Sequence, residues 1–204
     1  MMIRARAPLR VGLAGGGTDV SPFCDLHGGY VLNATIDRYA YATLRRIEGS
    51  TAIFTSTDQG SLERIDLVDS MPLPLNGVLN LHKAVYNTMV MEFNHGRHIA
   101  VELTTFCDAP VGSGLGASST LVVAIIKSFV EFLNIPLDDY ALAKLAFRIE
   151  RLDCGLQGGR QDQYSATFGG FNFIEFPDAN RVVVNTLRLK SWIASELEAS
   201  LLLF

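Results

Sequence analysis

A glycine- and serine-rich stretch at residues 110–120 carries groups that could bind phosphate. Its sequence is PVGSGLGASST, and an apolar run follows at residues 121–126. Glycines let the backbone curl tightly and leave no side chain in the way of a ligand. A helix that begins at Ser118 or Ser119 would direct free backbone N–H groups and its positive end toward this curl. Such an arrangement suits a phosphate group, and a serine hydroxyl there can reach a magnesium ion that bridges phosphates. The candidate nucleotide-binding residues are Pro110, Gly112, Ser113, Gly114, Leu115, Gly116, Ala117, Ser118 and Ser119.

A plain loop with a serine helix cap is the alternative interpretation of this stretch. The stretch also differs from the common phosphate-binding loop, because neither Lys-Ser nor Lys-Thr follows its last glycine. By itself it therefore indicates an anion site and not an enzyme class.

Phosphoryl transfer also needs a carboxylate that holds metal and a group that takes or orients the acceptor's proton. Glu150 is a candidate for the first role. On a helix expected over 138–152, it falls beside the apolar stripe and outside the charged face formed by Lys144, Arg148 and Arg151. An acid in that position needs a partner such as a metal ion. A boundary glutamate paired with an arginine is the alternative.

Asp162 is a candidate for the second role. It lies in the glycine-rich, polar stretch 155–170, which we expect to be a loop, and a loop aspartate can also be a simple turn former. Arg10 lies in an expected strand. Near a pocket it could lower the pKa of an aspartate and neutralise phosphate charge, and a surface arginine at a strand edge is the alternative.

A glycine triplet at residues 15–17 forces a turn before Thr18 and Asp19. The stretch GLAGGG at residues 12–17 is close to a dinucleotide-binding fingerprint, and Asp37 follows at a strand end. However, Pro22 and the next glycine pair leave only about ten residues for a crossover helix, and such a crossover usually needs a dozen. Equilibrium dialysis with ATP and with NAD would separate a kinase from this second enzyme class.

Composition excludes several function classes. The chain has 204 residues, 49% of them hydrophobic and 19% charged, with a formal net charge of −4. This balance gives no basic surface for nucleic acid or for anionic membranes, and no apolar run is long enough to cross a bilayer. The cysteines, Cys24, Cys107 and Cys154, are too widely spaced for a zinc site and odd in number. We expect a cytoplasmic protein with no nucleic-acid or membrane partner.

The rest of the chain alternates strand and helix patterns. Residues 2–14 read as a strand interrupted near Pro8, and residues 30–37 and 39–46 as a strand and its continuation in a hairpin. In the helix over 138–152, Leu152 belongs to the expected inner stripe. The other expected strands are 52–56, 62–67, 99–103, 171–176 and 182–187; the other expected helices are 79–93, one that follows the glycine-rich stretch, and 192–199; residues 71–77 are an expected loop.

These residues resemble the small-molecule kinases that include galactokinase, homoserine kinase, mevalonate kinase and phosphomevalonate kinase, the GHMP family. The family's signature Pro-x-x-x-Gly-Leu-x-x-Ser is matched by Pro110, Gly114, Leu115 and Ser118. The resemblance implies ATP and Mg²⁺ as cofactors. It also implies an α+β fold in which a mainly antiparallel sheet packs on helices, similar to ribosomal protein S5 domain 2.

The resemblance also implies roles for individual residues. Ser118 and Glu150 match the family's metal-binding serine and glutamate. Asp162 matches its catalytic aspartate, and Arg10 matches the basic residue beside that aspartate. The implied substrate-binding residues are Gly16, Gly17, Thr18 and Asp19.

Within this family the sequence is most similar to bacterial D-glycero-D-manno-heptose 7-phosphate kinases. This implies ATP-dependent phosphorylation of the C1 hydroxyl of a heptose 7-phosphate, a small-molecule sugar phosphate, for nucleotide-activated heptose and lipopolysaccharide. A kinase for another sugar, or a sugar-binding regulator without turnover, is the alternative. Residues 1–204 would be the N-terminal, ATP-binding domain, cut inside a strand before a C-terminal domain that holds a third glycine-rich motif.

Overall fold

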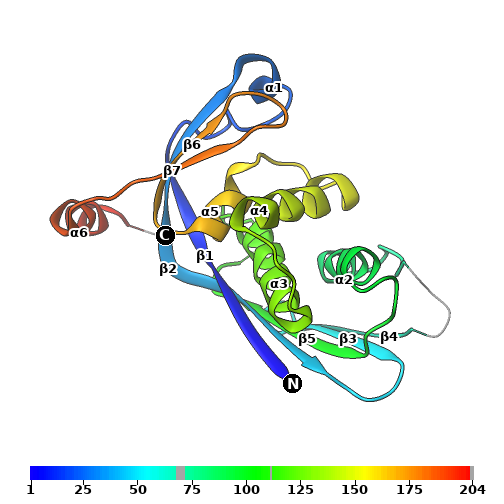
Figure 1. Ribbon diagram of the computed structural model, residues 1–204. Helices are drawn as coiled ribbons and strands as arrows, with labels where there is room; N and C mark the ends of the chain where they lie inside the picture. Colours follow the sequence, from blue (N-terminus) through cyan, green and yellow to red (C-terminus); the bar gives the residue numbers. More distant parts are fainter. Residues whose placement is uncertain (68–71, 111, 203–204) are drawn as a thin grey trace.

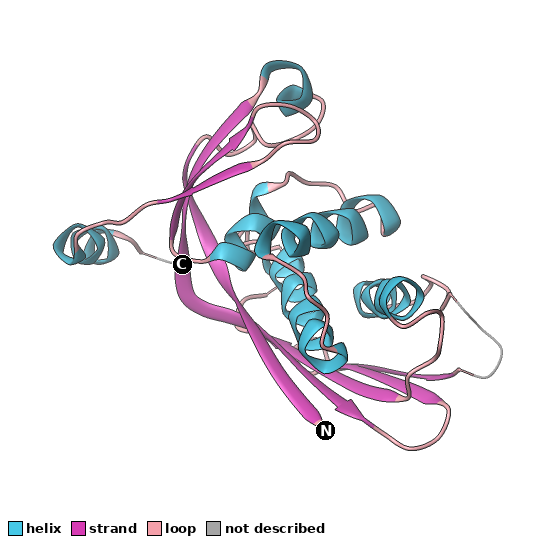
Figure 2. Cartoon of the chain, viewed as in Figure 1, coloured by secondary structure: helices cyan, strands magenta, loops and turns pink. Residues whose placement is uncertain are grey.

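The fold is a single curved sheet with most of its helices on one face (Figures 1 and 2). The computed structural model describes residues 1–67, 72–110 and 112–202. In this part of the chain seven strands form the order β4-β3-β5-β2-β6-β7, and β1 pairs with β2. Every pairing is antiparallel except that of β3 with β5. The expected α+β class with a mainly antiparallel sheet is confirmed.

The bounds of the strands are β1 Met2–Ala14, β2 Gly29–Arg46, β3 Thr51–Ser56, β4 Ser61–Asp66, β5 Val101–Cys107, β6 Phe171–Phe176 and β7 Val183–Thr186. The helices are α1 Phe23–His27, α2 Asn80–Phe93, α3 Ala117–Leu133, α4 Asp139–Phe147, α5 Gln161–Phe168 and α6 Ser191–Ser200, and a π-helical segment, Arg148–Asp153, continues α4. Part of the expected loop 71–77 and the last two residues of the chain lie outside the described residues.

Strand β2 is the central strand of the sheet. The expected hairpin between residues 37 and 39 is wrong, because β2 is one strand of 18 residues. It pairs with β6 through residues 29–34 and with β5 through residues 40–46, while β1 lies along its other edge. No glycine or proline interrupts residues 30–46, so nothing in the sequence forces a turn there. The pairing of β1 shifts register between Pro8 and Arg10, which is where the sequence suggested an interruption.

The antiparallel pairing of β1 with β2 rules out the dinucleotide-binding alternative. That fold requires two parallel strands joined by a crossover helix. Here only the five-residue helix α1 lies between β1 and β2, and the two strands run in opposite directions. The glycine triplet at residues 15–17 therefore belongs to a turn between antiparallel strands.

Helix α3 forms the centre of the core. It contacts β1 and β2 on one side and α2, α4 and α5 on the other, as Figure 1 shows. Residues 122–126 are fully buried, which confirms the expectation that this helix is buried over most of its circumference. The N-terminus of α3 points to the glycine-rich loop, so core packing fixes the position of that loop.

The π-helical segment changes which side chains face the core. A π-helix closes its hydrogen bonds over one residue more than an α-helix, so the phase of the following side chains shifts. Leu152, expected on the inner stripe, is 68% exposed, whereas Glu150, expected at the edge of that stripe, is fully buried. Both expectations were wrong because they continued the α-helical period past Phe147.

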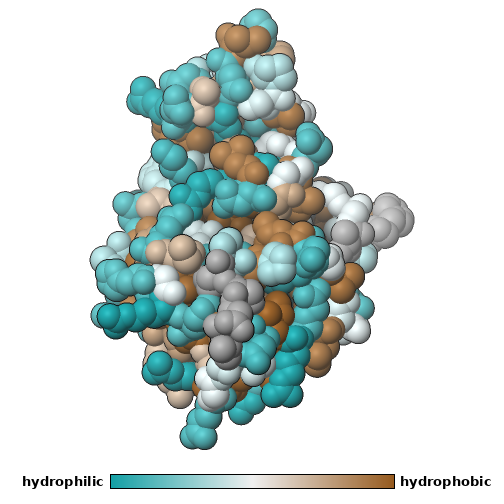
Figure 3. Space-filling view, turned by 90° about the vertical axis from the view of Figure 1, so that its right-hand side faces the viewer, coloured by the Kyte–Doolittle hydropathy of each residue, from teal (hydrophilic) through white to brown (hydrophobic). Residues whose placement is uncertain are grey.

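Apolar and hydrophilic side chains are interspersed on the face in Figure 3. None of the helices in the described ranges combines the length and the apolarity that a bilayer crossing needs.

A buried histidine makes the stability of the fold depend on pH. His82 of α2 is 2% exposed, and its Nε2 lies 2.8 Å from the hydroxyl of Thr105. Burial lowers the pKa of His82 to about 4. Its contribution to stability is therefore complete above the unfolded pKa of about 6.5 and is lost as the pH falls from there to about 4.

We expect His82→Gln to remove most of this pH dependence, which amounts to about 3 kcal/mol of the free energy of unfolding. Urea unfolding of both proteins at pH 7 and pH 4.5 measures it. Equal pH slopes in the two proteins would contradict the assignment.

Candidate active site

The glycine-rich loop has the backbone of an anion site. Gly112, Gly114 and Gly116 all have positive φ angles, of +85°, +74° and +77°. A Cβ atom at Gly112 or Gly114 would meet nothing within 4 Å, so this part of the loop faces open space. Gly116 is the N-cap of α3 and offers no side chain to its first N–H groups. Those groups and the positive end of the helix are therefore available to a phosphate.

Arg10 connects this loop to Asp162. Its Nε and Nη2 each lie 2.6 Å from Oδ1 of Asp162, and its Nη1 donates to the carbonyl oxygen of Gly114 at 2.7 Å. Its backbone N–H also donates to the carbonyl oxygen of Leu115. A Cβ atom at Gly116 would lie 3.2 Å from Cγ of Asp162. The arginine, the aspartate and the loop therefore form one unit, as the sequence predicted.

Asp162 lies in a helix and not in the expected loop. It occupies the first turn of α5, whose backbone begins after the glycine-rich segment 155–160. The carboxylate of Asp19 accepts a hydrogen bond from the backbone N–H of Gln161 at 3.0 Å and so caps this helix. The hydrophobic pattern of the sequence did not predict α5, because the buried face of this helix is largely polar. Residues 161, 163, 165 and 167 are all buried.

Burial raises the pKa of Asp162 above its ordinary value, although the neighbouring Arg10 opposes the shift. The negative charges of Asp19 and Glu150 raise this pKa further. The expectation that Arg10 keeps the pKa of Asp162 low is therefore wrong in its net direction. A raised pKa makes a carboxylate a stronger base near neutral pH.

Glu150 is the centre of a second cluster. Its carboxylate accepts a hydrogen bond from Ser118 at Oε1 and another from Ser119 at Oε2, both of 2.6 Å. Arg151 lies 3.3 Å from Oε1. The hydroxyl of Ser118 and Oε1 are hard oxygen donors side by side, the type of ligand that Mg²⁺ prefers. In the described residues no three His, Cys, Asp or Glu side chains gather into a metal site.

Hydrogen bonds of Asp19 connect the glycine turn at residues 15–17 to α5. Asp19 is 1% exposed, and its Oδ1 accepts hydrogen bonds from the backbone of Gly17 and the side chain of Gln161, each of 3.2 Å. Thr18 donates to the carbonyl oxygen of Tyr30 and accepts from the N–H of the same residue. A Cβ atom at Gly16 or Gly17 would meet nothing within 4 Å, so the turn presents bare backbone. Asp19 as a direct substrate ligand stays a prediction.

Sequence reasoning missed two residues of the site. Arg151 was placed on a charged outer face, but it is nearly buried and donates to the hydroxyl of Ser119 at 3.2 Å and to the carbonyl oxygen of Gln157 at 2.9 Å. Gln163 is fully buried and contacts Glu150. The only available signal was the unusual sequence RQDQ, in which amides flank Asp162 on both sides.

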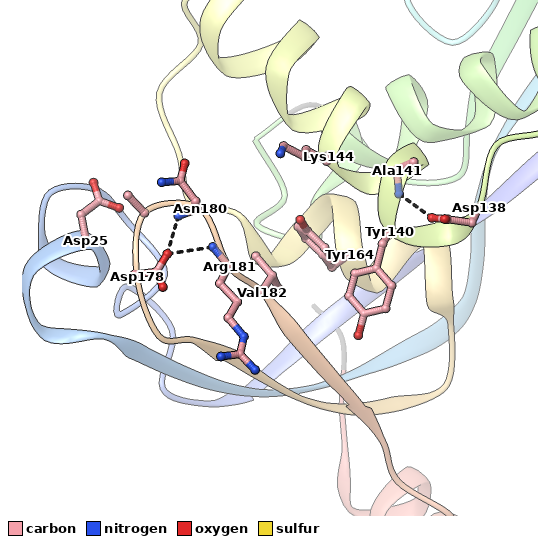
Figure 4. A pocket seen from close by; sticks show the side chains of 11 residues that line it. Asp25, Asp138, Tyr140, Ala141, Lys144, Tyr164, Asp178, Asn180, Arg181 and Val182 are labelled. Atoms are coloured by element: carbon pink, nitrogen blue, oxygen red, sulfur yellow. Dashed lines mark hydrogen bonds between the residues drawn. The ribbon is translucent and has the colours of Figure 1, made fainter.

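A cavity of about 800 Å³ lies elsewhere, between α4 and the turn that precedes β7 (Figure 4). Tyr140, Lys144, Tyr164, Asp178 and Arg181 are among its lining residues. None of the residues that we predicted for nucleotide, metal, substrate or catalysis lines this cavity.

Comparison with known proteins agrees with this geometry. Residues 80–170 match the GHMP kinases N terminal domain. Over these residues the chain is similar to the N-terminal domain of the GHMP kinases. A D-glycero-alpha-D-manno-heptose 7-phosphate kinase of Campylobacter jejuni is 52% identical over 202 residues, which are 99% of this chain and 59% of the relative. The chain therefore spans about three fifths of the length of that relative.

Solved structures agree with the assignment of the GHMP fold. A D-glycero-D-manno-heptose 1-phosphate kinase from Bacteroides thetaiotaomicron has a TM-score of 0.91 and 46% identity, over 98% of this chain and 64% of that one. A sugar kinase structure from Campylobacter jejuni has a TM-score of 0.85 and 52% identity, over 97% of this chain and 60% of that one. A mevalonate kinase from Methanococcus jannaschii, only 18% identical, shares the fold with a TM-score of 0.75, over 93% of this chain and 56% of that one.

Proposed function

We propose that the protein is an ATP-dependent kinase that phosphorylates the C1 hydroxyl of a heptose 7-phosphate. The observation that carries this proposal is the convergence of two clusters on the glycine-rich loop. Glu150 meets Ser118 at the start of α3, and Asp162 is bonded by Arg10, which also donates to the backbone carbonyl of Gly114 in the loop. One polyphosphate at this loop would contact both clusters.

Different residues of the chain perform different steps of phosphoryl transfer. The free N–H groups at the start of α3 hold the phosphates. Asp162 accepts or orients the proton of the sugar hydroxyl, and its raised pKa suits that role. Arg10 holds the Asp162 carboxylate in place and adds positive charge beside the transferred group. The open turn at Gly16 and Gly17 receives the sugar next to this carboxylate.

Ser118 and Glu150 would hold Mg²⁺. Their oxygens lie 2.6 Å apart, and the loop glycines leave open space for a ligand nearby. The ion would neutralise charge that develops on the phosphates.

Residues 1–204 would be the ATP-binding domain of a longer two-domain kinase, in agreement with the share of the relatives that they cover. We also propose that the enzyme works in the cytoplasm, where ATP is available, and supplies nucleotide-activated heptose for lipopolysaccharide.

A substrate panel with ATP and Mg²⁺ tests the proposal on the protein expressed from its complete reading frame. The panel should contain heptose 7-phosphate, heptose 1-phosphate, galactose, fucose and mevalonate, because the relatives' names differ in where the heptose carries its phosphate. We expect ADP release with heptose 7-phosphate, and a ³¹P spectrum with a new anomeric phosphate. Turnover of heptose 1-phosphate alone, or of none of these compounds, would refute the proposal.

Removal of the positive charge of Arg10 should change the dependence of kcat/KM on pH. Arg10 lowers the pKa of Asp162 against the larger effect of burial. In Arg10→Gln this pKa therefore rises further, and the acid limb of kcat/KM should move to higher pH. Steady-state kinetics between pH 5 and pH 9 measure the shift. Arg45→Gln, which alters an exposed pair with Glu102, is the control. An acid limb that stays in place in Arg10→Gln would contradict the assigned contact.

A further inference from the structure

The two carboxylate oxygens of Glu150 have different surroundings. Oε1 accepts a hydrogen bond from Ser118 and lies 3.3 Å from Nη1 of Arg151, while Oε2 accepts hydrogen bonds from Ser119 and from Nε2 of Gln163, both of 2.6 Å. Nε2 of Gln163 also donates to the hydroxyl of Ser119 at 3.1 Å. Oε2 is therefore fixed by two donors on the buried side. Oε1 faces the start of α3, where Ser118 lies.

The amide of Gln163 has only one possible orientation. A carboxylate only accepts hydrogen bonds, so the NH₂ group must face Glu150. This orientation leaves Oε1 of Gln163 buried without a partner, while the whole side chain is fully buried. An unsatisfied buried carbonyl costs stability, and this cost is offset by the amide N–H groups, which donate to Glu150 and Ser119. The contribution of Gln163 therefore lies in its donor group.

The position of Gln163 in the chain links the two clusters. Asp162 precedes it directly, so the helix that carries the proposed base also holds the proposed metal ligand. The backbone of Gln163 is secured by the hydroxyl of Thr167, which donates to its carbonyl oxygen at 2.8 Å. Helix α5 therefore connects Glu150, through Gln163, to Asp162.

We propose that Gln163 is a positioning residue, which together with Ser119 fixes Oε2 of Glu150 so that Oε1 is presented to the metal ion beside Ser118. This inference rests on the proposed function only in so far as Ser118 and Glu150 hold the ion. It does not depend on which sugar is phosphorylated.

Gln163→Met keeps the length of the side chain and removes the donor. We expect it to weaken Mn²⁺ binding in the presence of a non-hydrolysable ATP analogue by about tenfold, as one hydrogen bond to a charged group predicts. Electron paramagnetic resonance of free Mn²⁺ measures this in the absence of turnover. Ser165→Ala is the matched control: it alters a fully buried hydroxyl of α5 that bonds only to the carbonyl oxygen of Gln161. Unfolding temperatures of both variants report any loss of fold.

A double-mutant cycle sharpens the test. Ser119→Ala and Gln163→Met remove donors from the same oxygen, so their effects on Mn²⁺ affinity should not multiply. Wild-type Mn²⁺ affinity in Gln163→Met, or effects that multiply independently, would overturn the inference while sugar turnover stood. Weakened Mn²⁺ binding in Gln163→Met without turnover of any sugar in the panel would support the inference and refute the proposed function.

Discussion

Asp162→Asn is expected to lower kcat by a factor of about 10³, within the range for loss of a general base, while the affinity for ATP stays within about twofold of wild type. The amide keeps the shape of the side chain but cannot take a proton from the sugar hydroxyl. Asp162 contacts Arg10 and lies against Gly116, whereas the hydroxyl of Ser118 bonds to Glu150. Nucleotide binding should therefore survive. Single-turnover kinetics and calorimetric titration with an ATP analogue measure the two quantities.

Asp139→Asn is a matched control for this change, because Asp139 occupies the first turn of α4 as Asp162 occupies the first turn of α5. It should retain wild-type kcat. Near-normal turnover in Asp162→Asn would remove Asp162 from the mechanism. An equal loss in both variants would show that any charge change in a first helical turn damages the enzyme.

Glu150→Gln should reduce activity almost as strongly, and this effect should appear in kcat/KM. We expect kcat/KM to fall by about 10² to 10³, the usual range for loss of one preorganised electrostatic contact, together with weaker binding of the metal–nucleotide complex. The substitution keeps the size of the side chain, removes the negative charge, and leaves Arg151 nearly buried without its ion pair. Unfolding by urea should therefore also show a measurable loss of stability.

Glu92→Gln provides the comparison, because Glu92 forms an exposed ion pair with Arg148 at 2.6 Å. An exposed pair contributes little to stability, and this variant should match wild type in kinetics and unfolding. If Glu150→Gln bound the metal–nucleotide complex as tightly as Glu92→Gln does, Glu150 would not be a metal ligand.

The contacts of the site were predictable from the sequence only where a motif fixed them. The loop from Pro110 to Ser119 and the partners Glu150 and Asp162 follow from residue types and from the family signature, and Ser118 does contact Glu150. The proximity of Arg10 to Asp162 was also predicted, and it spans 152 positions of the chain. Without the family signature, the positions of these residues in the sequence would not have predicted that they lie together.

The missed features depend on tertiary structure. Helix α5 carries polar side chains on its buried face, so its hydrophobic period gives no helix signal. The π-helical segment after Phe147 breaks the α-helical phase, and this is why the burial of Glu150 and the exposure of Leu152 were both misjudged. The raised pKa of Asp162 depends on its burial, and burial is a property of the assembled site. In strand β2 the predicted turn failed because β1 pairs with residues on both sides of the expected turn, 32–35 and 39–45, and so holds β2 extended.

The central claim is that the loop before α3, Glu150 and Asp162 surround one polyphosphate. The most direct measurement is a crystal structure of the protein, expressed from its complete reading frame, with Mg²⁺, a non-hydrolysable ATP analogue and heptose 7-phosphate. We predict Mg²⁺ bound by Oγ of Ser118 and by Glu150, with the C1 hydroxyl within hydrogen-bonding distance of Asp162. A nucleotide bound in the cavity beside Tyr140 and Lys144, or a sugar remote from Asp162, would contradict the account.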